Sequence, residues 1–282
     1  LPSVIAQNVD VGVYILNLEK FDTATGSFTA DFYLSLRCQK ECISENFEFM
    51  NGRAVSLEKI INKPNEKFYR IQANLNSPVN LQRFPFDKQS MQIIIEDKNH
   101  TIDKVRYLPL LKETGIDESI TFTGWEITGF NAETKEHYYK VYDEIYSQYI
   151  LNIDISRIRL NSFIKTLLPA IFIVIVALFT FLLDPDKIAP RLTMISSSLV
   201  ASVLFHVSIS NQIPPVGYLT FADKFMLLTY FVILLSFIIS VIILQLSELN
   251  KTELLEKVHR GTEYSMFIIV PLLYLNLFIF FL

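Results

Sequence analysis

The pattern of hydrophobic and polar positions along the chain changes near residue 160. Before this point, apolar and polar side chains alternate in short runs that turn residues interrupt. After it come four long apolar runs, each close to the roughly twenty residues that a helix needs to cross the hydrocarbon core of a bilayer. The pattern therefore predicts two domains in different solvents, residues 1–159 and residues 160–282.

The first domain is predicted to be an antiparallel β-sandwich. Apolar residues recur at a period of two, as in half-buried strands, in VGVYILNLEKFD, SFTADFYLSLRC, KFYRIQANLNS, KQSMQIIIED, GWEITGFNAE and YILNIDIS. No convincing helical stretch separates these segments. Short strands at roughly ten-residue spacing favour a sandwich.

The second domain is predicted to be a four-helix transmembrane bundle. Its apolar runs cover about residues 163–183, 192–213, 225–246 and 264–282. Basic residues lie in the first and third connections, at Lys187, Arg191, Lys251, Lys257 and Arg260, whereas the second connection has only Lys224. The positive-inside rule therefore assigns those two connections to the cytoplasm and the β-sandwich to the extracellular or periplasmic side.

The second apolar run differs from the others by its polar side chains. These are Thr193, Ser196, Ser197, Ser198, Ser202, His206, Ser208 and Ser210. Polar groups in hydrocarbon are costly unless they face protein or water. One interpretation is helix–helix packing, because small hydroxyl residues let two backbones approach closely and hydrogen-bond across the interface.

The spacing within this run supports a second interpretation, a pore-lining helix. Thr193, Ser197, Val200, Leu204 and Val207 follow steps of four and three, which form one stripe along a helix. Several copies of the helix around a symmetry axis can enclose a pore. Hydroxyl rings would then replace the hydration that an ion loses, and apolar rings would close the path by dewetting.

Composition and motifs exclude several classes of function. The net charge is only −4, and no stretch combines basic with aromatic residues, so we expect no nucleic-acid partner. The sequence contains no G-x-S-x-G, Walker loop, H-E-x-x-H or glycine-rich dinucleotide turn, so we expect no enzyme and no cofactor. The histidines, His100, His137, His206 and His259, are scattered, which predicts no metal site.

The two cysteines admit two interpretations. Cys38 and Cys42 flank the tripeptide QKE. A three-residue loop between two extended strands would bring them within the Cα separation that a disulfide accepts, and an oxidising compartment would permit the bond. The alternative is a pair of buried free thiols.

Several motifs resemble those of the pentameric ligand-gated ion channels. The element Phe84-Pro85-Phe86-Asp87 in LQRFPFDKQS is similar to a turn that lies in this family at the membrane-facing end of the β-sandwich. TGWEI around Trp125, DISRIRL before the first span, Pro169 within that span and IPPVGYLTFAD after the second follow in the family's order and spacing. The resemblance covers nearly the whole chain.

Three departures point to the prokaryotic branch of this family. No cysteine pair brackets the Phe84–Asp87 element, no domain separates the third and fourth spans, and the family's Trp-x-Pro stretch is missing. The resemblance then implies a channel in a bacterial inner membrane, built from this chain and four further copies. Its other partners would be membrane lipid, permeant inorganic ions and an agonist.

The resemblance also implies two sets of site residues. Coupling between the domains would involve the Phe84–Asp87 element with Asp22, Arg157, Pro214, Pro215 and Tyr218. The agonist would bind beneath a hairpin near ETKEHYYKVYDEIYSQY, where Tyr138, Tyr139, Tyr142 and Tyr146 would form part of an aromatic box for an amine. One alternative is that these tyrosines only cover a strand face. Another is that protons act as the agonist and that acidic groups and the histidines sense them.

Ion selectivity follows from the residues before the second span. Asp184 and Asp186 are the nearest acids and favour cations. The resemblance implies that Arg191 points away from the axis, as the matching basic residue does in cation-conducting relatives. Ala189 and Pro190 stand where cation-conducting relatives carry glutamate. Anion-conducting relatives typically carry Pro-Ala-Arg there, whereas this chain has Ala-Pro-Arg, so an anion-selective channel is the alternative. A non-conducting, membrane-anchored binding protein is a further alternative, but such an anchor has no use for the stripe.

Overall fold

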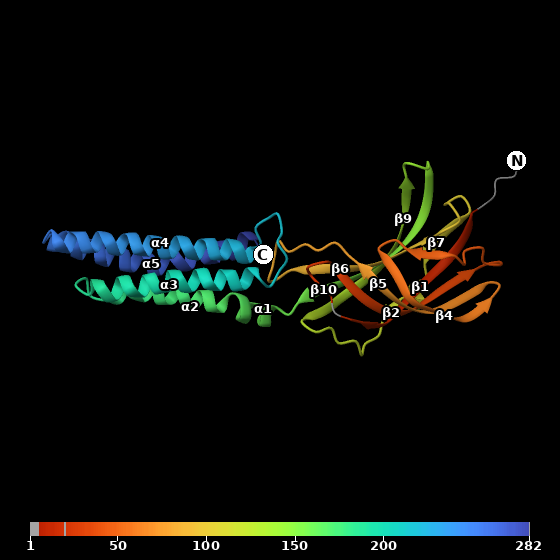
Figure 1. The fold of residues 1–282 in the computed structure, drawn as a ribbon, viewed down its shortest axis with the longest axis horizontal. Helices are drawn as coiled ribbons and strands as arrows, with labels where there is room; N and C mark the ends of the chain where they lie inside the picture. The colour runs from red at the N-terminus through yellow and green to blue at the C-terminus, as the bar shows by residue number, and fades with distance from the viewer. Residues whose placement is uncertain (1–5, 20, 282) are drawn as a thin grey trace. The chain divides into compact units, whose positions relative to one another are not determined.

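The computed structural model describes residues 6–19 and 21–281, and its backbone contacts divide the chain into two units. The β unit consists of the residues up to Val79 and of Lys88–Ser156 (Figure 1). The helical unit consists of Asn80–Asp87 and of the residues from Arg157 onward. The short segment Asn80–Asp87 thus leaves the β unit and joins the helices.

The larger sheet of the β unit has six strands. Its order is β4 (Gly52–Lys63), β5 (Glu66–Asn76), β2 (Ser27–Cys38), β1 (Gln7–Leu18) and β7 (Val105–Pro109), with β8 (Gly115–Ile116) also paired to β1. Neighbours from β4 to β1 are antiparallel, whereas β7 and β8 lie parallel to β1. A short 3-10 turn, η1 (Leu111–Glu113), separates β7 from β8.

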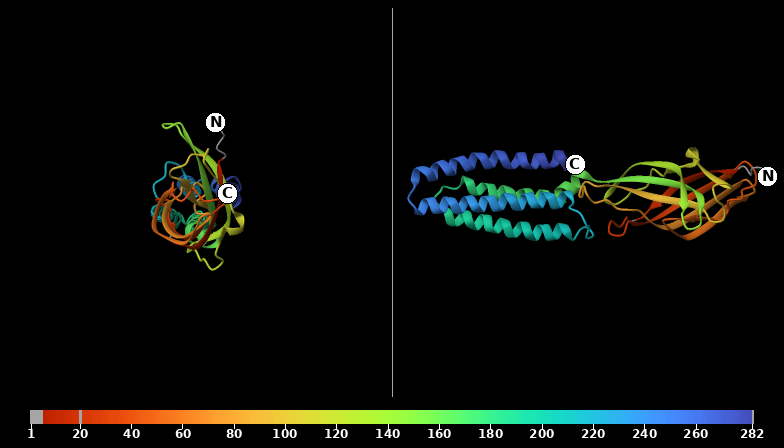
Figure 2. Two further views of the ribbon diagram at one scale, coloured as in Figure 1. Left: turned by 90° about the vertical axis from the view of Figure 1, so that its right-hand side faces the viewer. Right: turned by 90° about the horizontal axis from the view of Figure 1, so that it is seen from above.

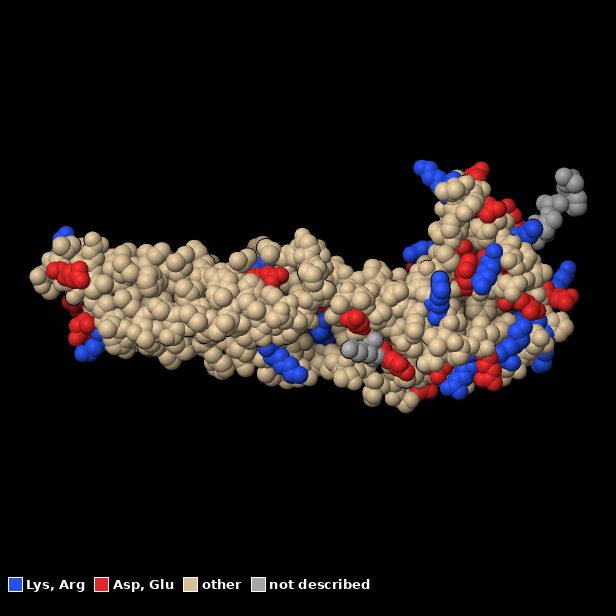
Figure 3. Space-filling view, in the orientation of Figure 1, with Lys and Arg blue, Asp and Glu red and all other residues tan. Residues whose placement is uncertain are grey.

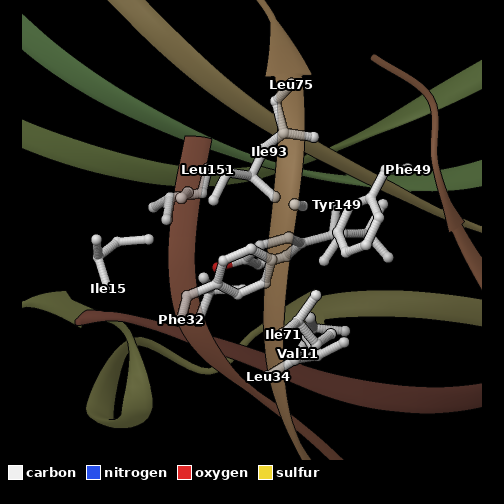
Figure 4. Close-up of a cluster of buried hydrophobic side chains, with 14 of the residues drawn as sticks. Val11, Ile15, Phe32, Leu34, Phe49, Ile71, Leu75, Ile93, Tyr149 and Leu151 are labelled. Carbon is white, nitrogen blue, oxygen red and sulfur yellow. The ribbon is translucent and has the colours of Figure 1, made fainter. Parts of the chain in front are cut away.

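The smaller sheet has the order β3 (Phe47–Phe49), β6 (Lys88–Asp97), β10 (Glu144–Arg157) and β9 (Trp125–Tyr139). β6 pairs antiparallel with both β3 and β10. Alternate residues of β5 and β6 are buried, which is the period of two that the sequence contains. The buried faces of both sheets contribute to one hydrophobic core, for example Phe32 and Ile71 from the larger sheet and Leu151 from the smaller (Figure 4). The predicted β-sandwich is confirmed.

The turn after β2 carries the two cysteines. Cys38 and Cys42 are joined by a disulfide, with their Cα atoms 5.4 Å apart. Both side chains are buried at the edge of the hydrophobic core.

The helical unit contains α1 (Arg159–Thr166), α2 (Leu168–Phe179), η2 (Thr180–Leu182), α3 (Ile188–Ser210), α4 (Phe221–Glu248) and α5 (Thr252–Phe281). Helices α2 to α5 run side by side (Figures 1 and 2). Three helices, α3, α4 and α5, are long and apolar enough to cross a membrane, and the bent pair formed by α1 and the segment Leu168–Leu182 makes a fourth candidate span. On the face shown in Figure 3, charged side chains of this unit lie near the ends of the helices.

The first span is bent by 44°. The pattern predicted one continuous run, but α1 ends at Thr166 and α2 begins at Leu168. Pro169 lies in the first turn of α2, where its missing N–H costs nothing. A continuous helix would bring the proline ring against the carbonyl of Lys165, four residues earlier, and this clash explains the break.

The fourth helix begins earlier than the apolar pattern predicted. It starts at Thr252 and includes twelve polar and mixed residues before Tyr264. Ion pairs one turn apart, Lys257 with Glu253 and Arg260 with Glu256, support this segment as a helix. Hydropathy finds the part of a helix that lipid surrounds, and therefore misses such an extension.

Candidate functional site

The Asn80–Asp87 segment caps the first turn of α4. The N–H of Phe221 donates to the carbonyl of Gln82 at 2.9 Å, and the N–H of Ala222 donates to the carbonyl of Phe84 at 3.0 Å. A helix leaves these N–H groups without an intrahelical partner. The loop backbone therefore supplies the acceptors that the start of α4 needs.

A capping box satisfies the remaining two N–H groups of this turn. Thr220 Oγ1 accepts from the N–H of Asp223, and Asp223 Oδ2 accepts from the N–H of Thr220 at 2.8 Å. All four free N–H groups at the start of α4 thus have partners. The cap and the loop together fix where α4 begins.

Aromatic side chains strengthen the same contact. The ring of Phe86 lies 5.9 Å from the ring of Phe221 and 6.4 Å from the ring of Phe278 on α5. Tyr218, in the connection between α3 and α4, accepts a 2.9 Å hydrogen bond at its hydroxyl from the N–H of Leu81. The loop therefore contacts α4, α5 and the connection that follows α3.

An ion pair closes the other side of the loop. Arg157 Nε donates to Asp87 Oδ1 at 2.6 Å, and the Arg157 guanidinium lies 5.1 Å from the centre of the Phe84 ring. The Asp87 side chain is 1% exposed and that of Arg157 21% exposed. The pair joins the loop to the residues that lead into α1.

The other residues assigned to coupling have different surroundings. Asp22 belongs to the β unit, where its carboxylate accepts from the N–H of Ala24 at 2.9 Å and from the hydroxyl of Thr25 at 3.0 Å. Pro214 is half-buried and Pro215 exposed, both in the connection after α3. Tyr218, rather than either proline, makes the hydrogen bond to the loop.

The stripe on α3 is exposed along its whole length in the single chain. Its members are Thr193, Ser197, Val200, Leu204 and Val207. The buried residues of the helix are Arg191, Ile195, Ser198, Ser202 and Ile209. The two sets lie on different faces of α3, because the buried set faces the neighbouring helices α2 and α4.

The hydroxyl residues of α3 divide between these two faces. Ser198 and Ser202 are buried, as helix packing requires, and Ser202 donates to the carbonyl of Leu199. Thr193 and Ser197 remain exposed, and Thr193 donates to the carbonyl of Ala189 at 2.9 Å. Packing within the chain therefore accounts for Ser198 and Ser202 but not for Thr193 and Ser197.

The acids before α3 are both exposed. Asp186 lies 3.4 Å from the ammonium of Lys187, and Asp184 lines a cavity with His259 and other residues of α5. Arg191 is fully buried and donates through Nη2 to the carbonyl of Leu183 at 2.7 Å. Its Nε and Nη1 have no hydrogen-bond partner within the described part of the chain.

Two of the four tyrosines assigned to the ligand site lie together. The rings of Tyr139 on β9 and Tyr146 on β10 meet edge to face, with centres 5.4 Å apart. Tyr138 instead donates to Asp143 at 2.8 Å, and Tyr142 lies in the turn at the end of the hairpin. Successive residues of a strand point to opposite faces, which separates Tyr138 from Tyr139.

The sequence did not single out Glu96, which is the centre of this cluster. Its buried carboxylate accepts from Tyr139 at 3.0 Å and from Gln148 at 2.8 Å, and lies 3.1 Å from Nδ1 of His137. Burial, followed by the hydrogen bond to Glu96, raises the pKa of Tyr139. An acid at the end of the apolar run QIII was the only signal for it in the sequence.

Sequence comparison links the chain to known channels. It is 24% identical over 161 residues to the proton-gated ion channel of Gloeobacter violaceus, covering 57% of this chain and 44% of the relative. It is also 26% identical over 179 residues to acetylcholine receptor subunit alpha-like 2 of Drosophila melanogaster, covering 60% and 31%. The resemblance to the pentameric ligand-gated ion channels is confirmed.

A third relative is named as a chloride channel, whereas the sequence of this chain favoured cations. The chain is 25% identical over 158 residues to pH-sensitive chloride channel 2 of Anopheles gambiae, covering 53% of this chain and 26% of the relative. No family model matches the chain. The chain spans less than half the length of each of these relatives. All three are named as channels or receptor subunits, which agrees with the prediction of a non-enzyme.

Proposed function

We propose that the protein is a ligand- or proton-gated ion channel assembled from five copies of this chain, with α3 lining the pore. The observation that supports this proposal best is the exposed stripe on α3, opposite residues that are buried against α2 and α4. A helix that only anchors a domain has no reason to expose two hydroxyls in line with three branched apolar residues.

The pore has a wet end and a dry end in this proposal. Rings of Thr193 and Ser197 offer oxygen atoms to a passing ion, whereas rings of Val200, Leu204 and Val207 offer none and close the path by excluding water. The bacterial inner membrane holds the helices, and the β unit lies in the periplasm.

Cations are the proposed permeant ions. Asp184 and Asp186 are exposed acids immediately before the pore helix, and five copies of each would concentrate cations at its mouth. The buried position of Arg191 supports this choice, because its charge does not face the exposed stripe. An anion-selective channel is the second candidate, favoured by the lack of a glutamate at Ala189 and Pro190 and by the relative named as a chloride channel.

The agonist is proposed to act at the hairpin of β9 and β10. Tyr139 and His137 contact the buried carboxylate of Glu96 there, and the ring of Tyr146 packs edge to face against that of Tyr139. Aromatic rings beside a carboxylate suit an organic ammonium ion. A histidine beside the same carboxylate suits a proton.

Ion flux through purified protein tests the proposal. Liposomes carrying the protein should conduct sodium when the external solution is acidified or when choline is added, and light scattering corrected for detergent should give a pentamer. A monomer as the dominant species, or no flux under either condition, would contradict the channel. Reversal potentials in a sodium chloride gradient decide between cations and anions.

A further inference from the structure

His206 is the one histidine of α3, and both of its ring nitrogens contact α4. Nε2 lies 3.2 Å from Oδ1 of Asp223, and Nδ1 lies 2.9 Å from the hydroxyl of Tyr230. The side chains of His206 and Asp223 are each about four-fifths buried. His206 therefore ties α3 to two positions of α4 that are about two helical turns apart.

The chemistry of Asp223 and Tyr230 determines which nitrogen of the His206 ring carries a proton. An ionised Asp223 only accepts, so Nε2 of His206 carries a proton and donates it to Oδ1. In the neutral imidazole, Nδ1 accepts from the Tyr230 hydroxyl. Protonation of Nδ1 would reverse this second bond, because a phenol can also accept, and both contacts would persist.

Asp223 is also part of the cap that the Asn80–Asp87 loop completes. Its Oδ2 accepts from the N–H and the hydroxyl of Thr220, while its Oδ1 faces His206. The two residues before it, Phe221 and Ala222, donate their N–H groups to the carbonyls of Gln82 and Phe84. Hydrogen bonds to the loop and to α3 thus meet in the first turn of α4, whose backbone connects them.

His206 lies next to the stripe without belonging to it. On α3 it directly precedes Val207, the last apolar member, and follows Leu204 by two positions. These two residues are exposed, whereas the imidazole turns toward α4. A rotation of α3 that moves the apolar rings must therefore also move, stretch or break the contacts of His206.

We propose that His206 is the residue through which the start of α4 positions the pore helix during gating. This inference rests on the proposed channel function and adds a residue to it. Displacement of the Asn80–Asp87 loop shifts the first turn of α4, and Asp223 carries that shift to the imidazole of His206. The neighbouring residues Leu204 and Val207 then change their distance from the pore axis.

Sodium flux into liposomes, measured over a series of external pH values, tests this role. His206→Ala should lower maximal flux about fivefold or more, the lower end of typical coupling between sites, while the pentamer persists. His206→Gln should restore most of the flux, because its amide N–H can still donate to Asp223. Both variants lack a titratable group, so a difference between them reports the hydrogen bond and not the loss of a proton.

A double variant and a matched control complete the test. The effects of His206→Ala and Asp223→Ala should not add in full, because each removes the contact between His206 and Asp223. Tyr230→Phe should reduce flux more than Tyr274→Phe. The hydroxyl of Tyr274 contacts Thr229 of α4 at 2.8 Å and makes no hydrogen bond to α3 among the described residues. The tyrosine pair also keeps the test valid where His206→Ala fails to assemble.

The outcomes separate this inference from the channel itself. A wild type that conducts nothing contradicts the proposed function. A conducting wild type whose flux is unchanged in His206→Ala contradicts the role of His206. Additive effects of His206→Ala and Asp223→Ala contradict it as well. Equal flux in Tyr230→Phe and Tyr274→Phe, together with no rescue by His206→Gln, also overturns it.

Discussion

Arg157 lies 70 residues after Asp87 in the sequence, yet its Nε donates a 2.6 Å hydrogen bond to Oδ1 of Asp87. The Asp87 carboxylate is buried, and the Arg157 guanidinium also covers the ring of Phe84. The pair therefore holds the loop against the residues that lead into the first span. Surface ion pairs contribute little, but a buried carboxylate without its partner is costly.

Arg157→Ala is therefore expected to destabilise the protein by about 3–5 kcal/mol and to abolish gating or assembly. Thermal unfolding in detergent and liposome flux measure the two effects. Arg159→Ala is the matched control, because Arg159 is exposed at the start of α1 and should tolerate the change. A normal response of Arg157→Ala to the agonist would contradict the assignment of Arg157 and Asp87 to coupling.

The stripe predicts the position of the gate. Leu204→Ser should shift the activation curve toward lower agonist concentration or give spontaneous flux, because serine weakens apolar contact across the axis by about 1–2 kcal/mol per side chain. Repetition in five copies should enlarge the effect on the open population. Val200→Ser should act in the same direction.

The control for this change is Phe172→Ser on α2. Phe172 is 58% exposed and Leu204 66% exposed, so both sites lose a similarly exposed apolar group. Phe172→Ser should leave the activation curve unchanged. If the activation curves of Leu204→Ser and Val200→Ser are both unchanged at normal expression, the stripe is not the gate. Helix packing would then be the better interpretation of α3.

In the proposed channel, the charge immediately before α3 should determine which ions pass. Asp186→Asn is expected to lower sodium conductance or to move the reversal potential toward that of chloride, because five fewer negative charges weaken the local potential. Single-channel recording in a sodium chloride gradient measures both. If Asp186→Asn and Asp184→Asn each leave both quantities unchanged, neither acid sets the selectivity.

The hairpin cluster predicts that the stability of the folded protein decreases at alkaline pH. The pKa of Tyr139 is raised by burial and by its hydrogen bond to Glu96, so its phenol contributes stability that is complete below about pH 10. That contribution is lost as the pH rises through the higher pKa of the folded state. The free energy of unfolding, measured at increasing alkaline pH, should decrease more steeply for the wild type than for Tyr139→Phe.

At neutral pH the same substitution should be destabilising. Tyr139→Phe removes one of the donors to the buried Glu96 carboxylate, at a cost of about 1–3 kcal/mol. Tyr142→Phe is the control, because Tyr142 is 71% exposed at the end of the hairpin. Equal melting temperatures of the two variants would remove Tyr139 from the Glu96 cluster.

Periodicity predicted the elements that are buried on one face or surrounded by lipid. It found β2, β5 and β6 and the apolar part of each span, because their side chains repeat at the period of the backbone. It missed β4, an edge strand whose residues are almost all exposed and therefore show no alternation. It also missed the bend at Leu167, which depends on one proline rather than on hydropathy.

A candidate site could be predicted from the sequence where all of its residues lie on one helix or strand. The α3 stripe follows from spacing along a single helix. The Glu96 cluster joins β6, β9 and β10, and the His206 contacts join α3 to α4. Such sites depend on strand register and helix packing, which no local pattern in one sequence encodes.

The division of the chain constrains how its parts can be exchanged with those of related proteins. The chain crosses between the two units three times, because Asn80–Asp87 belongs with the helices although it lies inside the sequence of the β unit. A single cut before Arg157 would remove this segment from α4 and leave the N–H groups of Phe221 and Ala222 without their acceptors. A working chimera therefore requires two grafts, the helices together with these eight loop residues.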